Sequence, residues 1–173
     1  MTELTAGWKL FRLICILQMI VVSLELILSA IGLTIGLFNL KFFFYSLFST
    51  LIYLVIFIFL YQGLSLINYN YPDTPLSPRQ KKSFNWLYLL NFLLIAFLFG
   101  QIVNEWRTTI PIWQLLDDAS LSDYLFYGYS FLIAILLFSF HIIFLGGMYN
   151  LRRLIYQNTI ETWKEQFADT KKI

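Results

Sequence analysis

Long apolar runs separated by short polar segments dominate the chain. The four runs cover about residues 13–38, 42–67, 85–103 and 125–149. An α-helix rises about 1.5 Å per residue, so about 20 apolar residues cross the hydrocarbon core of a bilayer. The pattern predicts an all-α membrane protein, a single domain in which four transmembrane helices form two antiparallel hairpins. The first run is longer than the apolar part of a signal peptide, about 7–15 residues, so we expect it to remain as a span.

The polar segments predict how the runs are connected. Residues 39–41 allow only a tight turn between the first two helices. The connector 68–84 has three prolines at three-residue spacing, which favours an extended chain over a helix. Ser77, Pro78 and Gln80 have the pattern of a capping box with proline at the first helical position. We expect the third helix to begin at this box, before its apolar span begins.

Residues 104–124 form the longest segment expected outside the membrane on the side opposite the connector. Ile112 and Trp113 belong to an apolar stretch that would not float free in water. We expect this outer loop to lie on the membrane surface, with a short interfacial helix. It is either a cover that closes the outer ends of the helices, or a docking surface or lid.

Apolar residues continue past residue 149 at helical spacing. In the tail 150–173, Leu154, Trp163 and Phe167 fall largely on one helical face, opposite charged residues. The fourth helix is therefore expected to extend into an amphipathic cytoplasmic tail. This tail either lies at the inner membrane interface or against the connector, or it docks a cytoplasmic or membrane partner.

Composition excludes several classes of protein. Apolar residues make up 59% of the 173 residues and charged residues 13%, against about 45–50% and about 25% in soluble domains. A net charge of +2 without a basic stripe argues against nucleic-acid binding. A single cysteine and a single histidine rule out a disulfide framework, a bis-histidine haem and a two-histidine metal site. We expect no cofactor, and membrane lipids as partners.

Positive charge predicts the orientation in the membrane, because cytoplasmic loops retain lysine and arginine. With the N-terminus inside, ten of the 12 basic residues fall in inner segments and two, Lys41 and Arg107, in outer ones. Acidic residues do not share this bias, since four of the ten fall in the outer loop. We expect both termini to be cytoplasmic, in a bacterial inner membrane. The inner basic residues are Lys9, Arg12, Arg79, Lys81, Lys82, Arg152, Arg153, Lys164, Lys171 and Lys172.

Polar side chains inside the spans mark the candidate site. Glu25 is the one charged residue in a span interior, about 18 Å from the inner boundary, and His141 lies about 12 Å deep. The two approach each other if the first and fourth helices are neighbours. Gln18, Gln62 and Asn91 share the inner half with them. Because lipid offers no hydrogen bonds, these groups are expected to turn inward and pair. They form either a structural hydrogen-bond network, or a working site with a proton-carrying carboxylate or a polar ligand pocket.

Small and aromatic residues indicate packing. Gly32 and Gly36 form a GxxxG motif, which permits close helix contact. We expect them to pack against the second helix rather than to form a dimer. Aromatic runs such as residues 42–45 occur along the whole chain and are expected to face lipid or the core.

Residues 74–90, TPLSPRQKKSFNWLYLL, carry a resemblance to a protein family. They resemble a segment of small bacterial four-helix integral membrane proteins of unknown function, in which a proline–serine segment precedes a basic helix start between the second and third spans. Leu76 stands where an aromatic residue is more usual. This resemblance implies a four-helix architecture and no particular activity.

The position of Glu25 is also similar to that of a functional glutamate in the first helix of small multidrug exporters. Those chains are much shorter, and they carry almost balanced basic charges because they assemble as antiparallel dimers. The distribution of ten basic residues inside and two outside favours one fixed orientation here.

Three functions are compatible with these patterns. The favoured one is a non-enzymatic accessory, assembly or regulatory subunit of a membrane complex. The alternative is a proton-coupled small transporter or channel that uses Glu25, with His141 as relay or partner. An enzyme acting on lipid or quinone has less support, since the sequence has no nucleophile–base pair, metal motif or phosphate-binding loop.

Overall fold

The four apolar runs fold as four long helices. The structure, a computed structural model, describes residues 4–115 and 121–170. Helices α1 (Ala6–Gly36) and α2 (Leu40–Tyr69) form one hairpin, and α3 (Pro78–Leu115) and α4 (Leu121–Thr170) form the second. Each helix is long and apolar enough to cross a membrane. The chain is thus a small, all-α integral membrane protein with four candidate spans. These spans are Ala6–Gly36, Leu40–Tyr69, Pro78–Asn104 and Gly128–Lys164.

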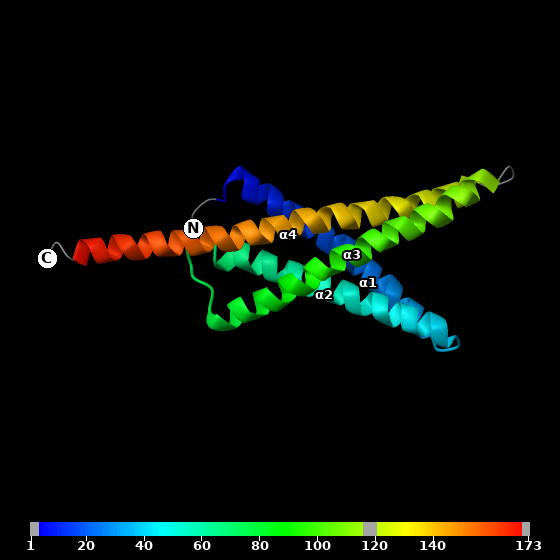
Figure 1. Ribbon diagram of the computed structural model, residues 1–173, viewed down its shortest axis with the longest axis horizontal. Helices are drawn as coiled ribbons and strands as arrows, with labels where there is room; N and C mark the ends of the chain where they lie inside the picture. The colour runs from blue at the N-terminus through cyan, green and yellow to red at the C-terminus, as the bar shows by residue number, and fades with distance from the viewer. Residues whose placement is uncertain (1–3, 116–120, 171–173) are drawn as a thin grey trace.

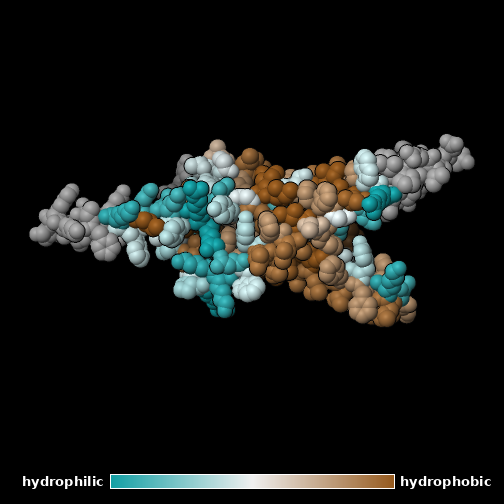
Figure 2. All heavy atoms as spheres, viewed as in Figure 1, coloured by the Kyte–Doolittle hydropathy of each residue, from teal (hydrophilic) through white to brown (hydrophobic). Residues whose placement is uncertain are grey.

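The two hairpins cross each other in the shape of an X (Figure 1). Within each hairpin the two helices pack on each other, and α1 also lies against α4, and α2 against α3. The first turn of α1, the connector and the last turns of α4 lie toward one end of the molecule, the terminal end. The α1–α2 turn, the end of α3 and the start of α4 lie at the other, the turn end, where the hairpins diverge. Apolar residues cover the middle of the visible face (Figure 2).

Four buried phenylalanine rings join the helices where the hairpins cross. Phe144 on α4 stacks on Phe11 of α1 with ring centroids 6.1 Å apart, and meets Phe59 of α2 edge to face at 5.1 Å. Phe59 meets Phe84 of α3 at 5.6 Å. Each helix contributes one ring to this four-ring cluster, and none of the rings is more than 7% exposed. The cluster is thus an aromatic contact between the two hairpins.

Small residues set the close approach of α1 and α2. A Cβ atom added to Gly32 would lie 2.8 Å from Ser46 Oγ, and one added to Gly36 would lie 2.7 Å from the main-chain Cα of Phe43. The GxxxG motif therefore faces α2 within the chain. One turn deeper, Thr50 Oγ1 donates a hydrogen bond to Ser29 Oγ over 3.1 Å.

The predicted capping box at the start of α3 is confirmed, and both of its reciprocal hydrogen bonds are formed. The Ser77 main-chain N–H donates to Gln80 Oε1 over 2.8 Å, and the Gln80 N–H donates to Ser77 Oγ over 3.2 Å. Two of the main-chain donors at this helix start are thereby satisfied. Asn39 is the N-cap residue of α2, and its Oδ1 accepts a hydrogen bond from the Phe42 N–H over 3.3 Å.

The structure differs from the outer loop expected over residues 104–124. Helix α3 continues to Leu115 and α4 begins at Leu121, so residues 116–120 separate the two helices. Trp106 on α3 still contacts Phe131 on α4, with ring centroids 5.8 Å apart. A continuing α-helix satisfies its own main-chain N–H and C=O groups, which a surface loop would leave to other partners. Whether residues 104–124 act as a cover, a lid or a docking surface depends in part on residues outside the described range.

The fourth helix continues past its apolar span, as the amphipathic pattern predicts. Its extension lies against the connector, where Asn158 Nδ2 donates to the Pro72 carbonyl over 3.0 Å and Thr159 Oγ1 donates to the Asp73 carbonyl over 2.8 Å. Leu154 is half-buried, and Trp163 is 60% exposed. The side chain of Phe167 lies outside the described residues.

Candidate functional site

A cavity with polar lining residues lies within the spans, between the diverging hairpins. All four helices line it, and its volume is about 610 Å³. We call it the Glu25 cleft, because Glu25 is its acidic residue. Leu28, Phe97, Ile133 and Leu137 supply apolar walls. Its other polar lining residues are Tyr45, Tyr53, Gln101, Asn104, Tyr129 and Ser130.

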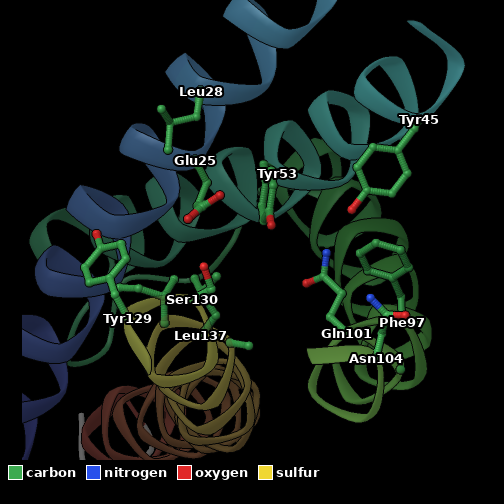
Figure 3. Close-up of a pocket in the computed structure, with 13 residues that line it drawn as sticks. Glu25, Leu28, Tyr45, Tyr53, Phe97, Gln101, Asn104, Tyr129, Ser130 and Leu137 are labelled. Atoms are coloured by element: carbon green, nitrogen blue, oxygen red, sulfur yellow. The ribbon is translucent and has the colours of Figure 1, made fainter. Parts of the chain in front are cut away.

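Three polar side chains from three helices point into the same space (Figure 3). Glu25 reaches in from α1, Tyr53 from α2 and Gln101 from α3. Ser130 adds a hydroxyl from α4. The spacing of the sequence explains this convergence, because residues on one helical face recur every three or four positions. Glu25 and Leu28 follow this spacing on α1, as do Gln101 and Asn104 on α3.

The carboxyl group of Glu25 has no hydrogen bond or ion pair with any residue that the structure describes. Its side chain is half-buried between the helices. An ionised carboxylate at membrane depth is costly unless a proton, a cation or a hydrogen-bond donor neutralises it. The cleft therefore presents an acidic group that needs a partner.

The cleft has the chemistry of a binding site. A carboxylate attracts a cation, and tyrosine rings such as those of Tyr45, Tyr53 and Tyr129 offer faces on which a cation is stabilised. Amide and hydroxyl groups add hydrogen-bond donors and acceptors. The lining residues that the structure describes include one carboxylate and no second acid, histidine or cysteine, which is a poor ligand set for a metal ion. The volume falls within the range of small-molecule sites, about 300–1,000 Å³.

His141 lies outside the cleft, on the face of α4 that meets α3. It is fully buried, and its Nε2 donates a hydrogen bond to the Asn91 main-chain carbonyl over 2.8 Å. The side chain of Asn91 is also buried and donates through Nδ2 to the Leu87 carbonyl. His141 is one helical turn past Leu137, the last lining residue on α4. The structure thus brings His141 to Asn91 and leaves Glu25 in a different environment.

The two glutamines of the expected network do not pair within the described part of the chain. Gln18 is fully buried on α1, and neither its amide nitrogen nor its amide oxygen has a hydrogen-bond partner there. The same holds for Gln62 Oε1 on α2, for Asn91 Oδ1 and for His141 Nδ1. Of the five polar residues singled out in the sequence, two are joined by a hydrogen bond, and that bond goes to a main-chain atom.

Most of the cleft's lining was not singled out from the sequence. Tyr45 belongs to an aromatic run interpreted as lipid-facing or core, and Gln101 lies near the end of an apolar run. The signal was the pair Gln101 and Asn104, two amides on one helical face at the edge of the span. The tyrosines gave no separate signal, because aromatic residues occur along the whole chain.

Comparisons with known proteins identify no relative of this chain. No family model, no curated protein and no solved structure matches it. The resemblance of residues 74–90 to small bacterial membrane proteins therefore rests on that segment alone. Sequence and structure together establish the chain as a small integral membrane protein with four candidate spans, and they identify no family.

Proposed function

We propose that the chain is a small, non-enzymatic, proton-coupled transporter that binds an organic cation in the Glu25 cleft. The observation that carries this proposal is the carboxyl group of Glu25, which faces a cavity lined by all four helices and has no partner among the described residues. A proton and a cationic ligand would compete for the same carboxyl group. Such competition is the simplest way to couple the movement of one to the movement of the other.

The wall chemistry supports a cation rather than an anion. Among the described residues that line the cleft, one is acidic, none is a lysine or arginine, and three are tyrosines. Its hydrophobic walls favour a cation that carries apolar groups.

The test uses tetraphenylphosphonium, a lipophilic cation, with the purified full chain. The wild type is expected to bind it, and Glu25→Gln is expected to lower the affinity by at least about tenfold, because the charge partner is lost while the size is kept. In proteoliposomes with an internal pH dye, adding the cation is expected to drive proton movement in the wild type and not in the variant.

Glu161→Gln is the matched control, since Glu161 is an exposed carboxylate on the α4 extension. It is expected to leave both binding and proton movement unchanged. Unaltered transport in Glu25→Gln, or absence of cation binding by the wild type, would contradict the proposal.

A second candidate function is that of an accessory, assembly or regulatory subunit of a membrane complex. It is favoured by the end of α4, which projects beyond the other helices at the terminal end of the molecule (Figure 1). Trp163 on this projection is 60% exposed. An exposed tryptophan on a rigid helix is a typical anchor of a protein interface.

This candidate predicts a stoichiometric partner that co-purifies with the native chain after mild detergent extraction. Trp163→Ala is expected to weaken that association by about tenfold or more, as for other interface tryptophans. Trp86→Ala is a suitable control, because Trp86 is equally exposed, at 60%, near the start of α3. A native chain that purifies reproducibly alone would count against a subunit role.

The proposed orientation has both termini in the cytoplasm, in a bacterial inner membrane. It is supported by the ten basic residues expected on one side against two on the other. In this orientation the Glu25 cleft, whose lining includes Tyr45, Asn104 and Tyr129, lies toward the outer half of the spans, and the α4 projection reaches the cytoplasm.

A further inference from the structure

A second groove lies at the terminal end, where the start of α3 and the connector meet the extension of α4. Its volume is about 710 Å³. We call it the basic groove, because Lys81, Arg152 and Arg153 line it. The described residues of its lining include no aspartate or glutamate, in contrast with the Glu25 cleft. The groove therefore has the charge to receive an anion.

One of the three cations is held in place by its neighbours. Arg152 Nη1 donates a hydrogen bond to Asn85 Oδ1, and its guanidinium lies over the ring of Phe84, 4.9 Å from the centroid. A guanidinium has five N–H donors in a fixed fork, so the bond to Asn85 leaves others for a ligand. A fork positioned in this way suits the oxygens of a phosphate group.

The rest of the groove is apolar and aromatic. Phe84 and Ile155 form a buried floor, 2% and 0% exposed, and Tyr88 and Tyr149 continue it toward the apolar spans. Trp163 lies on the other side of the cations along α4. Figure 2 shows hydrophilic residues gathered at this end of the molecule, directly beside the apolar residues of its middle. A ligand seated here meets cations and an apolar surface together.

We propose that the basic groove binds the headgroup of an anionic phospholipid. Lys81, Arg152 and Arg153 hold the phosphate, and an acyl chain lies along Phe84 and Tyr88 toward the bilayer. Basic pockets at the membrane boundary next to apolar helix surfaces are suited to anionic lipids. This inference is independent of the Glu25 cleft, which lies on the opposite side of the helix crossing.

Native mass spectrometry of the full chain in detergent, with added lipid, tests the proposal. Phosphatidylglycerol is expected to bind at least about tenfold more tightly than phosphatidylcholine, which has no net charge. Replacing Lys81, Arg152 and Arg153 together by Gln is expected to remove that preference. Equal affinity for the two lipids, or an unchanged preference in the triple variant, would overturn the inference.

A second triple variant controls for net charge. Lys9→Gln, Arg12→Gln and Arg79→Gln remove three exposed cations toward the same end of the molecule without touching the groove, and the lipid preference is expected to survive. If the groove variant does not fold, Arg153→Gln alone must still lower the affinity, by about threefold or more. Displacement of the lipid by millimolar inorganic phosphate would assign the groove to a soluble anion and overturn the lipid assignment.

Discussion

Phe144→Ala is expected to lower the free energy of unfolding by about 3 kcal/mol. Phe144 is fully buried and its ring contacts Phe11 of α1 and Phe59 of α2, so its removal leaves a cavity where the two hairpins cross. Inside a membrane, association of helices depends on van der Waals packing more than on exclusion of water. A lost ring at the crossing point is therefore not compensated by lipid.

Unfolding in mixed micelles of mild detergent and dodecyl sulfate, followed by circular dichroism, measures this effect. Phe92→Ala is the matched control, because Phe92 is 56% exposed on the outside of α3. The control is expected to change stability by less than about 0.5 kcal/mol. Equal losses in both variants would show that the four-ring cluster does not hold the hairpins together.

Gly36→Ala is expected to destabilise the protein by about 2 kcal/mol. The added Cβ atom would lie 2.7 Å from the Cα and 2.9 Å from the main-chain nitrogen of Phe43. Main-chain atoms cannot rotate away as a flexible side chain can, so α1 and α2 must separate near their turn. In a helix open to lipid, the same substitution removes a flexible glycine and costs nothing.

Gly146→Ala provides that comparison, because a Cβ atom on Gly146 would meet nothing within 4 Å. The same unfolding assay is expected to show Gly146→Ala at or slightly above the stability of the wild type. If Gly36→Ala were as stable as Gly146→Ala, the close approach of α1 and α2 would not be a determinant of the first hairpin.

The sequence was sufficient for the elements of the fold, because each element is determined locally. A run of about 20 apolar residues in a bilayer must form a helix, because only a helix satisfies its own main-chain groups there. The capping box of Ser77 and Gln80 marks the start of a helix within four residues. The helices are longer than their apolar runs, as α3 shows by continuing to Leu115. An apolar run indicates which residues lie in the membrane. The helix itself continues until its main-chain groups find hydrogen-bond partners outside the helix.

The candidate site was only partly predictable. Glu25 stood out because a charge in a span is rare, but its surroundings depend on how two hairpins cross, which no local pattern encodes. The crossing separates Glu25 from His141, although their depths along the chain allowed them to meet. The side chain of His141 turns toward Asn91 on α3, within its own hairpin.

The continuity of α4 has a mechanical consequence. Its 50 residues make a rod of about 75 Å, more than twice the thickness of a bilayer core of about 30 Å. Ser130 in the wall of the Glu25 cleft and Arg152 in the basic groove lie on this one rod, on either side of its contact with Phe11 and Phe59. If α4 tilts about this contact so that the cleft widens, the part of the helix that carries the basic groove must move in the opposite direction.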